Sequence, residues 1–149
     1  MTRLKQYIMK QVKAGVIPYY IDNGVIKMLF MIPSDPLYGG SDYQIAKGTQ
    51  DYDNEFPIEI AKREGQEELG LKLDNILGDF TFAYKSKMSL YDLYVYIARI
   101  KNVNNFDPFD KETGKTSWLT IDELPKMRRD QQQAIQNVYD IILSREEVL

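Results

Sequence analysis

Residues 63–71 read Arg-Glu-Gly-Gln-Glu-Glu-Leu-Gly-Leu, and no other stretch of the chain says as much about its structure. In a helix, Glu64, Glu67 and Glu68 stand at positions i, i+3 and i+4 and share one face. Three neighbouring carboxylates repel one another, and the repulsion is relieved when the face binds a divalent cation. Oxygen ligands are the ones that Mg2+, Mn2+ and Ca2+ prefer. The pattern therefore predicts a helix with a metal-binding face.

Boundary signals for this helix lie on both sides of the stretch. Asn54 is a candidate N-cap, Pro57 suits a first turn, and Gly70 suits a left-handed C-terminal cap. We therefore expect a helix from about Pro57 to Leu69. Gly65 in mid-helix costs about 1 kcal/mol relative to alanine, so we expect it to permit close packing against a strand. The apolar residues expected to face a core are Ile58, Ala61 and Leu69, with Ile60 beside them.

The acidic pattern extends beyond the helix and resembles a known family signature. Glu55, seven further residues, and then Arg63-Glu64-x-x-Glu67-Glu68-x-Gly70-Leu71 resemble the signature of the Nudix hydrolases, with Gly48 as its opening glycine. The resemblance covers about Lys13 to Leu143. Two departures are visible: six residues instead of five separate Gly48 from Glu55, and Gly65 stands where the family prefers an aliphatic residue.

The resemblance implies a fold, a cofactor and an activity. The implied fold is the Nudix-type α/β/α sandwich with a mixed β-sheet, formed by a single domain over residues 1–149. The implied reaction is the cleavage of a nucleoside diphosphate linked to another moiety, with Mg2+ or Mn2+ as cofactor.

The order of the expected elements also indicates the α/β class. Asp22-Asn23-Gly24 predicts a hairpin turn. Asn102 to Lys115 is polar and turn-rich, Ile121 to Pro125 predicts a turn or short helix, and about Asp130 to Ser144 predicts an amphipathic helix. Strands alternating with helices imply a mixed sheet between helices. The expected strands are Ala14–Ile21, Val25–Ile32, Tyr43–Ile45, Phe80–Tyr84, Tyr91–Ile100 and Ser117–Leu119.

The chain contains no cysteine and no histidine, which excludes several kinds of site. A Ser-His-Asp triad, a thiolate nucleophile and a His/Cys zinc site are all impossible. The general base of an enzyme would therefore be a carboxylate, or a strongly perturbed lysine or tyrosine. Met1 to Gln6 lack a secretory apolar region, and no apolar run approaches the roughly 20 residues of a membrane span. We expect a cytoplasmic protein without contact with a membrane.

Acidic residues are concentrated between Asp51 and Glu68. This segment holds seven acids and two bases, a net charge of -5, whereas the whole chain has a net charge of -3. An anionic polyphosphate would approach such a patch only together with a cation.

The resemblance implies roles for individual residues. Arg63 would orient the glutamates as part of the catalytic machinery. Glu55 has two open roles, since it would either join the metal shell through water or form a salt bridge with Arg63. The implied metal ligands are Glu64, Glu67, Glu68 and the carbonyl of Gly48.

The general base has two candidates, Glu64 and Glu112. Glu112 lies six residues before Trp118, and a glutamate at a similar spacing before Trp-Leu lies opposite the helix in relatives. Asp110 and Asp107 are nearby substitutes. A solvated charge in a polar loop is the alternative interpretation of Glu112.

Substrate-binding candidates come from basic and aromatic residues. Lys47-Gly48 and the nearby Tyr43 resemble the corresponding residues of diadenosine tetraphosphate hydrolases and RNA pyrophosphohydrolases. Lys85 and Lys87 are candidates for phosphate binding. Arg128-Arg129 are a helix-flanking pair or a phosphate contact. The candidates for stacking on a base, or alternatively ordinary sheet aromatics, are Tyr84, Tyr91 and Phe109.

The resemblance, together with these residues, favours a pyrophosphohydrolase for a dinucleoside polyphosphate or an ADP-ribose-type dinucleotide. Two alternatives stay open: a 5′-end RNA pyrophosphohydrolase, and a non-catalytic domain that senses a nucleotide. Only the first alternative involves nucleic acid. A homodimer is compatible with all of these hypotheses.

Overall fold

The computed structural model describes residues 11–146, so the N-terminal segment Met1 to Gln6 lies outside the described part of the chain. Six strands form one sheet. Two α-helices, α2 (Pro57–Leu69) and α3 (Gln132–Glu146), belong to the described residues. None of the described helices is long and apolar enough to cross a membrane. The strands are β1 (Gln11–Asp22), β2 (Val25–Pro33), β3 (Ala46–Thr49), β4 (Thr81–Lys87), β5 (Tyr91–Arg99) and β6 (Thr113–Leu119).

Short 3-10 helices connect these elements. They are η1 (Pro36–Tyr38), η2 (Leu73–Asn75), η3 (Ile121–Lys126) and η4 (Arg129–Gln131).

The sheet is mixed and divides beside its central strand β1. The strand order is β4-β5-β1-β2-β6, with β3 paired to β1 in addition. β1 runs parallel to β5 and antiparallel to β2 and β3. Along one edge of β1, Lys13–Val16 pair with β3 and Tyr19–Asp22 pair with β2. β2 and β3 therefore pair with different parts of the same edge of β1 and diverge from each other. The candidate site lies next to the gap between these two strands.

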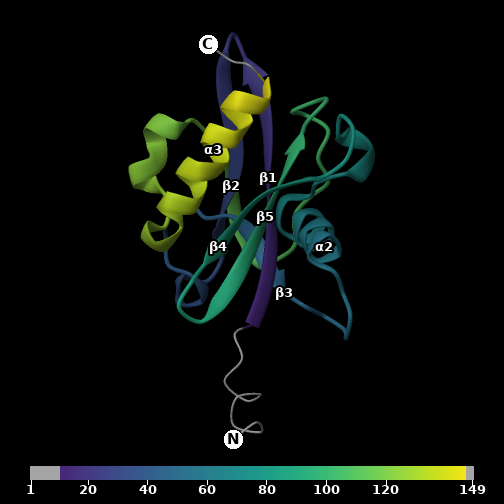
Figure 1. Ribbon diagram of the computed structural model, residues 1–149, viewed down its shortest axis with the longest axis vertical. Coiled ribbons are helices and arrows are strands. Elements are labelled where there is room, and N and C mark those ends of the chain that lie inside the picture. Colours follow the sequence, from purple (N-terminus) through teal and green to yellow (C-terminus); the bar gives the residue numbers. More distant parts are fainter. Residues whose placement is uncertain (1–10, 147–149) are drawn as a thin grey trace, which may run out of the picture.

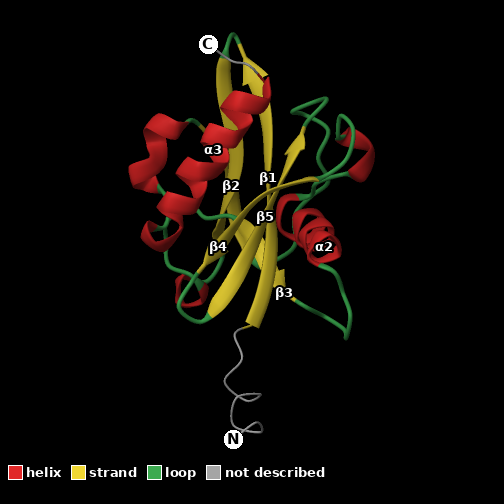
Figure 2. Cartoon of the chain, viewed as in Figure 1, coloured by secondary structure: helices red, strands yellow, loops and turns green. Residues whose placement is uncertain are grey.

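The two long helices cover opposite faces of the sheet. Figures 1 and 2 show α3 on one side of the strands and α2 on the other. Each helix buries its own apolar cluster: α2 packs over residues such as Val16 and Leu29, whereas α3 packs over residues such as Ile17 and Phe30. Alternate residues of one strand thus supply the two cores, as the two-residue period of a strand requires. The expected α/β class and the α/β/α sandwich with a mixed sheet are confirmed.

Local signals in the sequence account for several boundaries. Asn23 and Gly24 have φ values of 51° and 81°, as a two-residue hairpin turn requires, and they join β1 to β2. Gly70 ends α2 with φ 70°, and its amide bonds to the carbonyl of Gln66. The predicted hairpin, the predicted helix 57–69 and its glycine cap are confirmed.

The predicted N-cap of α2 is wrong. Phe56 occupies the cap position without a side-chain hydrogen bond, and Pro57 fills the first turn. Asn54 instead adopts a left-handed conformation with φ 67°, which asparagine tolerates better than most residues. Asn54 thus forms part of a turn in the loop between Gly48 and Glu55, which is one residue longer than the family signature expects.

Three strand predictions need correction because pairing between distant segments decides them. β3 covers Ala46–Thr49, while Tyr43 and Gln44 form only isolated bridges, so the predicted strand 43–45 is wrong. β4 continues to Lys87 because it pairs with β5 as far as Asp92. β6 begins at Thr113 because it pairs with β2, so the end of the predicted loop 102–115 is strand.

Candidate functional site

Helix α2 lies close to β1 because Gly65 faces the sheet. A Cβ atom at Gly65 would stand 2.9 Å from Cγ1 of Val16, tighter than an ordinary van der Waals contact. Ile60 and Ala61 are fully buried on the same side of the helix. The expected role of Gly65 in close packing is confirmed. This packing fixes the position of the α2 glutamates relative to β3.

Glu64 lies against the backbone of β3 at Gly48. A Cβ atom at residue 48 would stand 2.1 Å from Oε1 of Glu64, which is an impossible contact. Only glycine therefore allows the carboxylate to occupy its position. The Glu64 side chain is therefore enclosed between α2 and β3, and the residue is only 9% exposed.

Replacing Gly48 by alanine is expected to displace the Glu64 carboxylate. The new methyl group and Oε1 cannot both stay in place, because the helix is fixed at Gly65. We expect activity to fall by at least about tenfold and unfolding to become easier by about 1–3 kcal/mol. Thermal unfolding and steady-state kinetics measure both effects. Gly24→Ala is the matched control, since its Cβ meets nothing within 4 Å and its cost is confined to the exposed hairpin; equal losses of activity in both variants would contradict the expectation.

Arg63 connects the glutamates to the loop after β3. Its Nε donates to Glu55 Oε2 at 3.2 Å, its Nη2 to Glu55 Oε1 at 3.1 Å and to the Thr49 carbonyl at 2.8 Å, and its Nη1 to Glu64 Oε1 at 2.8 Å. The Glu55 carboxylate also accepts from the amide of Asp51 at 2.7 Å. Of the two roles considered for Glu55, the salt bridge with Arg63 is present. These hydrogen bonds lower the pKa of Glu55.

Glu68 stands one helical turn after Glu64 and binds the backbone of β3. Its Oε1 accepts from the amide of Lys47 at 3.0 Å. Burial, and then the neighbouring Glu64, raise the pKa of Glu68 to about 8. Burial likewise raises the pKa of Glu64 to about 7. The protein therefore holds two half-buried or buried carboxylates in positions that disfavour their negative charge.

This donor set fits a hard divalent cation. All available donors are oxygen atoms, and a cation beside Glu64 and Glu68 would remove the penalty for their charge. Glu67, the third glutamate of the helix, is exposed. No cluster of three or more His, Asp and Glu side chains suited to a metal ion occurs among residues 11–146. Glu64, Glu68 and the backbone at Gly48 are therefore the parts of the predicted metal site that the fold brings together.

A pocket of about 500 Å³ opens beside the acidic pair, in the split between β2 and β3. The loop before β6 forms one of its walls and is fastened to the end of α2: the amide of Asp110 donates to the Glu67 carbonyl at 2.8 Å, and Oγ1 of Thr113 to the Glu68 carbonyl at 2.9 Å. The pocket is lined by Met31, Pro33, Ser34, Asp35, Gln44, Ile45, Lys47, Glu68, Lys111 and Glu112.

Solved structures share this architecture. No protein-family model matches the sequence, and a search of curated proteins finds no match either. A Caenorhabditis elegans Ap4A hydrolase in a binary complex superposes with a TM-score of 0.69 at 19% identity, over 90% of this chain and 98% of that one. The NUDIX domain of Shewanella oneidensis NrtR, complexed with ADP ribose, gives 0.71 at 11% identity, over 91% and 90%. The Mycobacterium smegmatis Nudix hydrolase RenU gives 0.67 at 15% identity, over 88% and 86%.

This chain has the Nudix fold. Its α2 stands where the sequence signature predicted the acidic helix of that fold, and the extra residue before Glu55 is accommodated in the loop 50–56. Glu55 still reaches Arg63 through two hydrogen bonds, so the longer loop leaves this contact intact.

The Nudix fold brings only some of the predicted substrate-binding residues to the pocket. Lys47 and Glu112 both line it. Tyr91 lies next to Lys47, whose Nζ is 5.9 Å from the centre of its ring. Tyr43 and Tyr84 are half-buried and pack against the core under α3.

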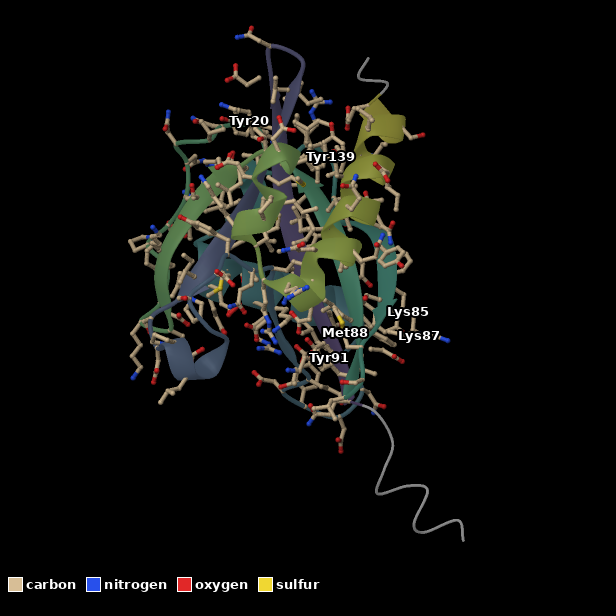
Figure 3. The ribbon with its side chains drawn as sticks, turned by 90° about the vertical axis from the view of Figure 1, so that its left-hand side faces the viewer. Tyr20, Lys85, Lys87, Met88, Tyr91 and Tyr139 are labelled. Atoms are coloured by element: carbon tan, nitrogen blue, oxygen red, sulfur yellow. The ribbon has the colours of Figure 1, made fainter. Side chains whose placement is uncertain are left out.

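The other predicted basic and aromatic residues do not line this pocket. Lys85 lies 3.8 Å from Asp92, and Figure 3 shows it beside Lys87 on the outer strand β4. Phe109 lines a second pocket, formed by residues of β2, β6, the end of α2 and the loop 103–109. Arg128 forms an ion pair with Asp130 at 2.8 Å.

Several residues of this region were not predicted from the sequence. Asp35 and Lys111 line the pocket from two separate loops. Gln131 is fully buried, and its Oε1 accepts from the amide of Ile45 at 2.9 Å. Lys13 lies over the ring of Tyr91 at 4.4 Å. Lys13 directly precedes the predicted strand 14–21, and no local signal in the sequence marked it as part of this region.

Proposed function

We propose that this protein is a divalent-cation-dependent pyrophosphohydrolase that cleaves a nucleoside diphosphate linked to another moiety. One observation carries the proposal: Glu64 and Glu68, one helical turn apart, are both held against β3, and Glu68 lines a pocket of about 500 Å³. When no cation is present, two such carboxylates with raised pKa values lower the stability of the protein as the pH rises and they become charged. A cation bound between these carboxylates would remove this cost.

The proposed ligands of the cation are Glu64 and Glu68, with Glu67 as a third carboxylate and the carbonyl of Gly48 as a backbone donor. A bound Mg2+ or Mn2+ would supply charge neutralisation at the phosphates and an activated water. Glu55, through Arg63, would keep Glu64 in the orientation that binding requires.

The remaining residues of the pocket have complementary tasks. Lys47 and Lys111 attract the phosphates, whose negative charge they counter. Met31, Pro33 and Ile45 provide apolar surface for the sugar or the base. We assign Glu112 as the general base, because it lines the pocket and its carboxylate forms no salt bridge with any residue among 11–146. In this role it accepts the proton of the attacking water.

The proposed substrate class is a dinucleoside polyphosphate or an ADP-ribose-type dinucleotide. The Lys47-Gly48 pair supports a dinucleoside polyphosphate. The similarity to the structures of an Ap4A hydrolase and of a NUDIX domain complexed with ADP ribose supports both substrate classes. The proposed location is the cytoplasm.

Replacing Glu112 by glutamine is expected to lower kcat by about 100-fold or more with little change in KM, as the loss of a general base does. Glu112 is exposed, so the melting temperature should stay unchanged. A kinetic comparison of the variant with the wild type checks both statements. A kcat within about threefold of the wild type would contradict the assignment of Glu112 and return Glu64, the other candidate, to consideration.

Product analysis of the purified protein tests the proposed function. The panel contains diadenosine tri- and tetraphosphate, ADP-ribose, NADH, FAD, nucleoside triphosphates and RNA with a 5′-triphosphate, each with and without Mg2+ or Mn2+. We expect metal-dependent cleavage of a dinucleotide to a nucleoside mono- or diphosphate. Tight binding of one nucleotide without turnover of any compound would contradict the proposal and favour a sensor.

A further inference from the structure

A cluster of positive side chains lies beside the candidate metal site, on the face of the sheet that α3 covers. Its members are Lys13 of β1, Lys47 of β3 and Arg128, which gather around Tyr91 at the start of β5. Nζ of Lys13 lies 4.4 Å and Nζ of Lys47 lies 5.9 Å from the centre of the tyrosine ring. Arg128 is close enough to act electrostatically on both Lys47 and Tyr91. Figure 3 shows Tyr91 near Met88, whose amide donates to the carbonyl of Tyr91 at 2.9 Å.

The backbone places these residues together. Lys47 pairs with Gly15 of β1, and Gly15 pairs in turn with Val95 of β5. A Cβ atom at Gly15 would stand 2.8 Å from Cβ of Lys47 and 2.3 Å from the carbonyl of Ala46. The absence of a side chain at Gly15 therefore allows β3 to lie close to β1, with Lys47 within reach of Tyr91. Lys13, two residues earlier on β1, has its side chain on the same face of the sheet.

The positive charges of this cluster are only partly compensated. Within the described part of the chain, neither Lys13 nor Lys47 forms a salt bridge, whereas Arg128 is paired with Asp130. Contacts of a lysine with an aromatic ring are weak, about 0.5–2 kcal/mol, and do not remove the repulsion between two ammonium groups. An anion between them would remove it, because charge-assisted hydrogen bonds to a phosphate are among the stronger ones.

The cluster joins the acidic pair directly. The amide of Lys47 donates to Glu68 at 3.0 Å, and both residues line the same pocket. Carboxylates suited to a cation thus stand on one side of Lys47, and ammonium groups suited to an anion stand on the other. This order of charges is complementary to a cation followed by a chain of phosphates.

We propose that Lys13, Lys47 and Arg128 form an anion subsite, with Tyr91 as its platform, that binds a phosphate group of the substrate beyond the one at the acidic pair. This inference rests on the proposed function for the location of the reacting phosphate. It selects substrates with a longer phosphate chain, such as dinucleoside polyphosphates, over ADP-ribose. It also implies that the ring of Tyr91 contacts the ammonium groups of the two lysines and does not stack on a base of the substrate.

Binding of inorganic tripolyphosphate to the full chain tests the subsite without any hydrolysis. We expect isothermal titration calorimetry in chelator and at low salt to show binding, which Lys13→Gln weakens about tenfold and Lys13→Arg preserves within about twofold. Lys101→Gln, which removes the same charge beyond the far end of β5, is the control and should bind like the wild type. No binding by the wild type, or equal weakening in Lys13→Gln and Lys101→Gln, would overturn the proposal.

A second measurement concerns the preference for chain length. With Mg2+ present, Lys13→Gln should reduce kcat/KM for diadenosine tetraphosphate at least about fivefold more than for ADP-ribose. An equal reduction for both substrates would overturn the assigned selectivity. If the wild type cleaves neither compound, the proposed function fails, and the tripolyphosphate titration still decides whether the subsite exists.

Discussion

Replacing Glu68 by glutamine should lower kcat by about 1,000-fold and, at the same time, stabilise the metal-free protein at alkaline pH. The loss of activity follows because glutamine removes one of the two carboxylates of the proposed cation site, and several kcal/mol of transition-state stabilisation depend on the cation. The gain in stability follows because the buried Glu68 carboxylate opposes folding when it is charged. Glutamine keeps the shape and can still accept from the amide of Lys47.

The direction of the pH dependence follows from the raised pKa. Glu68 has a pKa of about 8 in the folded protein and 4.5 as a free side chain, so between these values the folded state binds more protons. The stability that this group contributes is complete below about pH 4.5 and is lost as the pH rises through 8. Glu64, with a pKa of about 7, acts in the same direction.

Thermal unfolding of the metal-free protein between pH 5 and pH 9 measures this effect. We expect the wild type to lose stability across the range and Glu68→Gln to lose less, with a difference of at least about 1 kcal/mol at pH 9 and almost none at pH 5. Glu67→Gln is the matched control, because Glu67 is exposed and its replacement should change the pH dependence much less. A variant Glu68→Gln with the activity of the wild type would contradict the assignment of the site.

Replacing Arg63 by methionine is expected to cause the largest loss of stability, about 2–4 kcal/mol at neutral pH. Methionine keeps most of the aliphatic contact but leaves the Glu55 carboxylate, which is only 6% exposed, without its ionic partner. Breaking a buried pair by removing one partner costs more than the pair is worth, because the remaining charge stays buried. Activity should fall as well, since Glu64 loses its hydrogen bond to Nη1.

The origin of this loss can be identified by its pH dependence. Arg63 lowers the pKa of Glu55, so the contribution of the pair is present above about pH 4.5 and is lost as the pH falls through the lowered pKa. The difference between Arg63→Met and the wild type should therefore shrink in acid. Lys62→Met is the control, because the pair of Lys62 with the exposed Asp79 at 3.3 Å is worth less than about 1 kcal/mol. Equal destabilisation by both substitutions would contradict a special role of the Arg63 network.

The parts of the fold that were predictable from the sequence depend on local signals. The hairpin at Asn23-Gly24, the helix α2 and its cap at Gly70 are each specified by a few consecutive residues. The acidic residues of α2 could be assigned because helical spacing alone places Glu64 and Glu68 on one face. The spacing did not reveal that Glu64 is buried, since this depends on the contact between α2 and Gly48.

The remaining features depend on pairing between distant segments. β6 extends back to Thr113 because β2 is its partner, although its own residues Gly114, Lys115 and Thr116 lack a strand-like apolar pattern. The cluster around Tyr91 likewise requires β1, β3 and β5 to be adjacent, which no single stretch of sequence specifies. Lys13 could therefore not be predicted from the sequence as a member of the site.

The central claim is that Glu64 and Glu68 together hold a divalent cation at the pocket. Titration of the purified protein with Mn2+, followed by the electron paramagnetic resonance signal of the free ion, tests it without any substrate. We expect the wild type to bind Mn2+, Glu68→Gln to bind it at least about tenfold more weakly, and Mg2+ to compete in the wild type. Mn2+ affinity that is the same in Glu68→Gln as in the wild type would contradict the claim.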